Sequence, residues 1–158
     1  MRGKRIGSGA TLLAGALAVT GLAFAPTALA VTPTTASVTA NCGLFGGGAA
    51  TLTATQNGTA ATLTLKSTAI TAPIPIGANS INSTLTMANS TGSARVFTGT
   101  VNPAMPTGAP IEVGPLNGTV TSGDSLDFYR GSLKMVVFGI TVTCTATGAQ
   151  SPGPFVFN

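Results

Sequence analysis

Histidine is absent from this sequence, and charged residues make up only 6% of it. Histidine is the commonest general base, the usual activator of a serine or cysteine nucleophile, and the commonest metal ligand in proteins. Its absence excludes a Ser-His-Asp or a Cys-His enzyme. Because few other ionisable groups exist to be tuned for catalysis, we expect a protein that is not an enzyme, with no catalytic residue, no cofactor and no metal.

Carboxylates are equally scarce, because Glu112, Asp124 and Asp127 are the only acidic side chains. A hydrolase that works with a pair of carboxylates would have to draw on these three. Asp124 stands between Gly123 and Ser125, and Asp127 follows it at a spacing of three; beside such residues Asp ordinarily caps a turn through nearby backbone amides. Calcium needs about six to eight oxygen ligands, including several carboxylates. The pattern therefore favours turn capping over a calcium site.

The first 30 residues have the composition of a secretory signal. They contain a basic start, an apolar segment and a small-residue cleavage motif, namely Arg2, Lys4, Arg5, residues 10–25 and Ala28-Leu29-Ala30. Cleavage is expected after Ala30, because the competing site at Ala23-Phe24-Ala25 would leave Pro26 directly behind the cut. A membrane anchor is the alternative, but the apolar segment is shorter than the ~20 residues that a span requires. We expect a secreted protein, extracellular or associated with the cell wall, with no stable membrane insertion after cleavage.

Removal of this signal changes the charge of the chain. Four cationic side chains remain against three anionic ones, which gives a net charge of +1. Nucleic-acid binding needs clustered Lys and Arg, and we expect no such partner. By length, residues 31–158 form a single domain that can bury a core of its own.

The two cysteines, Cys42 and Cys144, lie near the two ends of this domain. In an exported protein such a pair is expected to form a disulfide. The alternative, a reactive thiol, would need a nearby cation or a helix start, and neither cysteine has one close in sequence.

Alternation of apolar and polar residues indicates strands throughout the domain. Leu133 to Thr147 is the longest such stretch, and its phase slips at Phe138-Gly139, which predicts a long strand, or two strands of one path, bent at a bulge. Asn57-Gly58 predicts a two-residue turn that joins two strands in a hairpin, and in this hairpin Leu52 faces Leu63. Further strands are expected over 38–42, 81–87, 94–101, 111–113, 116–121, 124–129 and 155–157.

About eight or nine short strands, with turn residues between them and no helical periodicity, predict an antiparallel Ig-like β-sandwich with one disulfide. The phenylalanines are interpreted as core: Phe45, Phe97, Phe128, Phe138, Phe155 and Phe157. The segment from Gly43 to Gly48 is interpreted as a flexible turn in which Leu44 and Phe45 are apolar anchors. Arg95, Tyr129 and Arg130 could form a binding face or simply lie at strand ends.

A resemblance rests on the alanine-rich leader, on VTANCGLFGGG around Cys42, and on ITVTC ending at Cys144 with Gly148-Ala149-Gln150 behind it. With these features the chain resembles uncharacterised exported β-sandwich proteins of actinobacteria that have one cysteine near each end of the domain. The resemblance implies a Cys42–Cys144 bridge and no known activity. Leu44-Phe45-Gly46 stands where that family has a proline turn, and an extra residue separates Gly148 from Gln150.

The function expected from these features is a structural or binding module at the cell wall or outside the cell. Its partner would be a cell-wall polymer or another surface protein. The alternative is a carrier of a small apolar molecule held between the sheets, with the segment from Gly43 to Gly48 as its gate.

Overall fold

The computed structural model describes residues 30–158, which form nine strands and one short 3-10 turn. The elements are β1 (Thr35–Asn41), η1 (Gly43–Phe45), β2 (Gly47–Asn57), β3 (Ala60–Thr71), β4 (Asn82–Ala88), β5 (Ala94–Gly99), β6 (Pro110–Thr119), β7 (Ser125–Val137), β8 (Ile140–Ala146) and β9 (Phe155–Val156). Within this part of the chain, no helix is long and apolar enough to cross a membrane. Residues 1–29 of the predicted signal, Ala28 included, lie outside the described residues, and Ala30 is the first residue described.

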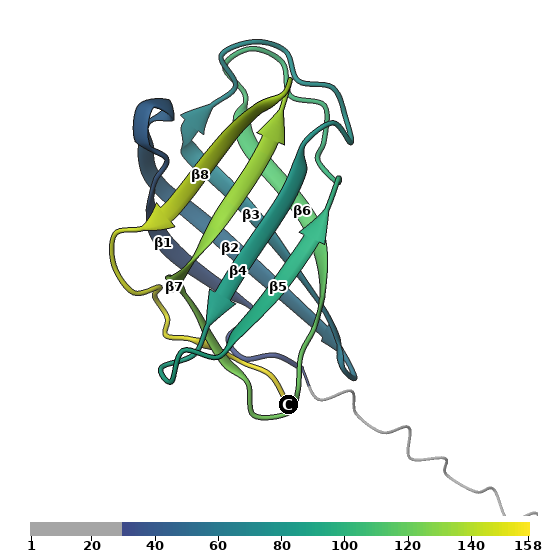
Figure 1. Ribbon diagram of the computed structural model, residues 1–158, viewed down its shortest axis with the longest axis vertical. Helices are drawn as coiled ribbons and strands as arrows, with labels where there is room; N and C mark the ends of the chain where they lie inside the picture. The colour runs from purple at the N-terminus through teal and green to yellow at the C-terminus, as the bar shows by residue number, and fades with distance from the viewer. Residues whose placement is uncertain (1–29) are drawn as a thin grey trace, which may run out of the picture.

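The strands β1 to β8 close into an antiparallel barrel (Figure 1). Around the barrel the order is β1-β2-β3-β6-β5-β4-β7-β8, and β8 returns to pair with β1. The pairing of β4 with β7 joins what would be the two separate sheets of a sandwich. The predicted two-sheet Ig-like sandwich is therefore wrong, although the all-β class and the disulfide are confirmed.

Two irregular strands help the sheet to close. The register between β3 and β6 shifts between Leu63 and Leu65, opposite Gly114-Pro115. In β7 the pairing with β4 shifts near Gly131, where an added β-carbon would overlap the backbone of Thr86. Bulges and glycines bend strands in this way at the corners of barrels. The separate strands expected over 111–113 and 116–121 are thus one strand, β6, with a bend, and the strand expected over 124–129 continues past Leu133 as β7.

The two tight turns also differ from their predictions. The β2–β3 turn is centred on Gly58-Thr59, so that Leu52 faces Leu65 and Ala54 faces Leu63. The shift of two residues from the predicted register keeps every side chain on its predicted face. At Phe138-Gly139 the chain reverses in a hairpin, with Val137 opposite Ile140, instead of continuing as one bent strand.

One end of the barrel is closed by aromatic and aliphatic side chains. Phe97, Phe128, Phe155 and Phe157 are fully buried, as predicted, and β9 adds to the first part of β7. Buried Gln150 holds the C-terminal tail, because its side chain accepts from the Phe128 amide and donates to the Gly153 carbonyl. We call this the closed end.

Cys42 and Cys144 form the predicted disulfide between the end of β1 and β8. The ladder between these strands contains only the pairs Ala40–Ala146 and Asn41–Thr145, whereas β1 and β2 share seven pairs. The disulfide therefore links the strands at one of the weakest seams of the barrel.

Candidate binding site at the open end of the barrel

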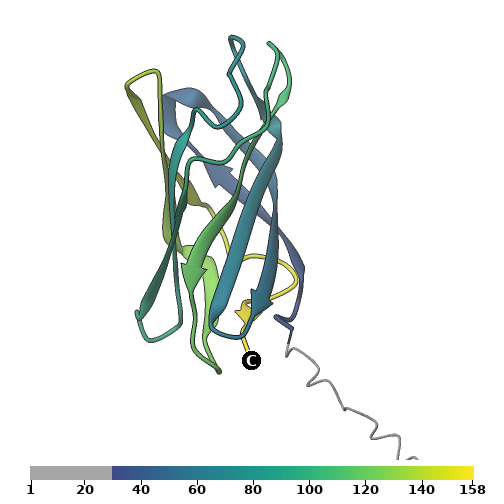
Figure 2. The same ribbon diagram turned by 90° about the vertical axis from the view of Figure 1, so that its right-hand side faces the viewer.

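The other end of the barrel, which we call the open end, holds a cavity of about 370 Å³. Figure 2 shows the β7–β8 hairpin on one side of this end and the β3–β4 and β5–β6 loops on the other. The cavity is lined by Cys42, Leu44, Phe45, Ile70, Thr71, Pro73, Ile74, Ile76, Ile81, Ile111, Met135, Val137, Phe138, Ile140 and Val142. Its volume lies at the lower end of the range of about 300–1,000 Å³ that is typical of small-molecule sites.

The floor of the cavity consists of inward-facing strand residues. Ile111 on β6, Met135 on β7 and Val142 on β8 are all buried and come from different parts of the barrel wall. The Cys42–Cys144 disulfide lies beside them, and Cys42 lines the cavity directly. The alternating pattern of the strands thus continues to the mouth. The floor residues are smaller or more slender than the phenylalanines that fill the closed end, so the barrel is hollow here.

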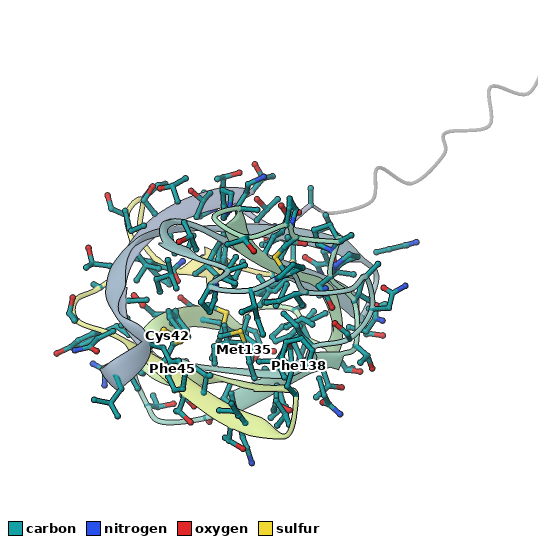
Figure 3. The ribbon with its side chains drawn as sticks, turned by 90° about the horizontal axis from the view of Figure 1, so that it is seen from above. Cys42, Phe45, Met135 and Phe138 are labelled. Atoms are coloured by element: carbon teal, nitrogen blue, oxygen red, sulfur yellow. A yellow bond between two sulfur atoms is a disulfide. The ribbon has the colours of Figure 1, made fainter. Side chains whose placement is uncertain are left out.

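Five exposed apolar side chains surround the mouth, and we call them the apolar rim: Leu44, Phe45, Ile74, Phe138 and Ile140. Leu44 is fully exposed at 103% and Phe138 is 61% exposed. Viewed down the open end, Phe45 and Phe138 lie on either side of Met135 (Figure 3). The interpretation of Leu44 and Phe45 as anchors, and of Phe45 and Phe138 as core, is therefore wrong.

Phe138 has a positive φ of 52°, and Gly139 follows with 76°. Two positive φ angles define a type I′ turn, in which Asn or Gly is preferred at the first central position. A bulky residue in the left-handed region is strained, at a cost of about 1–2 kcal/mol. Strained residues of this kind concentrate at functional sites, so Phe138 marks the mouth as a candidate site.

One wall of the mouth is fixed by the buried side chain of Asn102. Its oxygen accepts from the amides of Ser80 and Ile81 at 2.8 and 2.9 Å, and its nitrogen donates to the carbonyls of Gly77 and Pro103 at 2.8 Å. Ile76 and Met105 form a further backbone bridge between the same two loops. The β3–β4 loop, which presents Ile74, is thereby attached to the β5–β6 loop and held in place.

The chemistry of the cavity is uniformly neutral. Thr71 is the only lining residue with a hydroxyl, and no charged side chain lines the cavity. Such a surface has no group for acid–base or nucleophilic chemistry and no set of metal ligands. It can bury apolar surface, which contributes about 25 cal/mol per Å² removed from water.

The three carboxylates lie away from this cavity and have structural contacts. Glu112 forms an ion pair with Lys66 at 2.9 Å on the outside of the wall. Asp124 accepts from the Thr121 amide at 2.8 Å, so the predicted turn capping is confirmed for Asp124. Asp127 accepts from the Tyr129 amide at 2.8 Å, but both residues lie within β7, so Asp127 does not cap a turn. Among residues 30–158, no cluster of acidic, histidine or cysteine side chains could hold a metal ion.

Arg95, considered above as part of a binding face, instead contacts Asp124. Its Nε donates to Asp124 Oδ2 at 2.6 Å and its Nη2 to Oδ1 at 3.1 Å. This hydrogen bonding holds the pKa of the Asp124 carboxyl below its ordinary value. The folded-state pKa is thus lower than that of the unfolded chain, which is about 3.9. The pair therefore stabilises the fold above that unfolded value, and the contribution is lost as the pH falls through the folded pKa.

We expect Asp124→Asn to flatten the loss of stability in acid, because an amide has no proton to take up when the chain unfolds. Urea unfolding followed by circular dichroism from pH 7 down to strongly acidic pH measures this slope. Arg95→Met removes the same pairing from the other side and should flatten the slope in the same way. If Asp124→Asn keeps the full acid slope of the original protein, the assignment is wrong.

The structure brings together site residues that the sequence patterns did not connect. Leu44 and Phe45 among glycines, Ile74 between two prolines, and Phe138 before a glycine are large apolar residues in turns. Turn positions usually carry polar or small residues, so this mismatch was the available signal. The floor residues gave no signal, because their alternation is the same as that of any barrel core.

The geometry defines a class, a closed antiparallel barrel with an apolar cavity at one end. No protein-family model, curated protein or solved structure matches the chain. The resemblance to exported actinobacterial proteins stays a prediction.

Proposed function

We propose that the protein is a non-enzymatic carrier that binds a small, neutral, apolar molecule in the cavity at the open end. The observation that carries this proposal is the composition of the lining, in which Thr71 supplies the only hydroxyl and no residue supplies a charge. A ligand would be held mainly by burial of its own apolar surface and that of the floor. This corresponds to the carrier alternative above, with the site at one end of a barrel instead of between two sheets.

The exposed rim supports the same proposal. Large exposed apolar groups are costly for solubility, and here five of them surround one cavity. We further propose that the protein acts outside the cytoplasm, because disulfides persist in oxidising compartments and Cys42 and Cys144 form one beside the cavity. The expectation of a module that binds a wall polymer stays a prediction, since no feature of the described residues favours that ligand.

A change at Val142 tests the site. Val142 faces the cavity from β8, whereas its neighbour Thr143 faces outward from the same strand. Val142→Phe adds volume to the floor and should weaken binding of a neutral dye by about tenfold or more, because the dye loses buried area. Thr143→Phe adds the same ring outside the barrel and should leave binding unchanged.

Fluorescence titration with N-phenyl-1-naphthylamine, an uncharged probe, measures both variants against the original protein. Native mass spectrometry of the protein purified from its host would show a bound organic molecule directly. The proposal is overturned if the original protein does not bind the probe, or if both variants bind it as the original does.

A further inference from the structure

The apolar rim projects from the open end on three separate segments. Leu44 and Phe45 belong to η1, which directly follows the disulfide at Cys42, and Phe138 forms the tip of the β7–β8 hairpin. We infer that this end docks on the surface of a lipid layer and places the rim among the acyl chains. The docking depends only on the rim. The consequence that a ligand passes from lipid to cavity without crossing water rests also on the proposed function.

Hydrogen bonds hold the backbone of two of these segments, η1 and the β3–β4 loop. Around η1, the Cys42 amide donates a hydrogen bond to the Gly46 carbonyl at 2.8 Å, and the Gly43 amide donates one to Asn41 Oδ1 at 2.8 Å. Ile74 lies between Pro73 and Pro75, in the loop that Asn102 fastens. Side chains on a backbone that is already held in place lose little conformational freedom when they insert, so more of their burial appears as affinity.

No charged side chain belongs to the rim or lines the cavity, although Lys66, Glu112 and Lys134 lie on the outer wall in the half of the barrel nearer the mouth. The Arg95–Asp124 pair and Asp127 lie toward the closed end, where the Asp124 carbonyl also accepts from the Phe157 amide. Asn158, whose side chain donates to the Ala30 carbonyl, brings both ends of the described chain to this same end (Figure 1). Within residues 30–158, the rim therefore has no charged group, and both ends of this part of the chain lie at the opposite end of the barrel. Docking of this end should depend on apolar burial and only weakly on salt.

A lipid layer fits this end better than a protein does. Protein interfaces form about one hydrogen bond per 100–200 Å² and match in shape, but the rim side chains have no polar atoms and surround a hollow. A protein partner would have to fill the mouth and all the gaps between the projections. Acyl chains are deformable and fill such gaps without a matching shape.

Flotation with vesicles of uncharged phosphatidylcholine tests the inference. We expect the protein to float with the vesicles at low and at high salt. Phe138→Asn should weaken this partitioning by about tenfold or more, since one large apolar side chain no longer enters the lipid. This variant should still fold well, because Asn-Gly is the preferred sequence for a type I′ turn. Leu44→Ser, at a fully exposed position, should act in the same direction.

Tyr129→Asn is the matched control. Tyr129 is an aromatic residue of β7 that is 52% exposed on the outer wall, away from the rim, and its replacement should leave flotation unchanged. The inference is overturned if the protein does not float, if it floats only with anionic lipid, or if Tyr129→Asn weakens flotation as much as Phe138→Asn. Sedimentation that reveals a dimer abolished by Phe138→Asn would overturn it in favour of a second copy. Flotation without binding of the neutral dye would uphold docking and remove the proposed carrier function.

Discussion

Reduction of the Cys42–Cys144 disulfide is expected to lower the free energy of unfolding by up to about 4.7 kcal/mol, the largest effect of any single change considered for this protein. The bond closes a loop with a sequence separation of 102, so the reduced unfolded chain gains much conformational freedom. The β1–β8 seam, with its two ladder pairs, would then lose its only covalent link. Urea unfolding with and without a dithiol reductant measures the difference.

The double variant Cys42→Ala/Cys144→Ala provides the control for this experiment. It should show the lowered stability without reductant and should not respond when reductant is added. Because Cys42 lines the cavity and precedes η1, dye binding should weaken together with stability. Equal stability of the oxidised and reduced protein would contradict the role assigned to the disulfide.

Gly131→Ala is expected to destabilise the barrel by about 3 kcal/mol. A β-carbon at this position would overlap the carbonyl oxygen of Thr86 and lie 2.7 Å from its carbonyl carbon. Both atoms belong to the backbone of β4, so relief requires the β4–β7 ladder to separate. That ladder closes the sheet into a barrel, and its loss would expose the core at the contact.

Gly148→Ala is the matched control, because a β-carbon at Gly148 would meet no atom within 4 Å. At a position that tolerates it, alanine is neutral or slightly stabilising, since it reduces the freedom of the unfolded chain. Thermal unfolding of the two variants should therefore separate clearly. If Gly131→Ala unfolds at the same temperature as Gly148→Ala, the barrel does not need the close approach of the β4 backbone at Gly131, and the prediction is wrong.

The fate of the phenylalanines shows what sequence pattern can predict at this site. Phe97, Phe128 and Phe155 lie in strands, Phe157 directly follows one, and all four are buried as predicted. Phe45 and Phe138 stand next to glycines in turns, and both lie exposed at the mouth. A composition argument treats all six alike, because hydrophobicity does not say whether a residue fills a core or surrounds a cavity.

The sequence by itself determined the all-β class, most strand positions, the face on which each strand side chain lies, the disulfide and the turn capping by Asp124. These features depend on neighbours in the chain or on the pairing of the only two cysteines. Tertiary structure alone decided that β4 pairs with β7, that the β2–β3 register lies two residues from the predicted one, and that one end stays open. Alternation with a period of two records which face is buried, and it is identical in a sandwich and in a barrel. Closure and the cavity depend on which distant strands meet, for which no local pattern carries a signal.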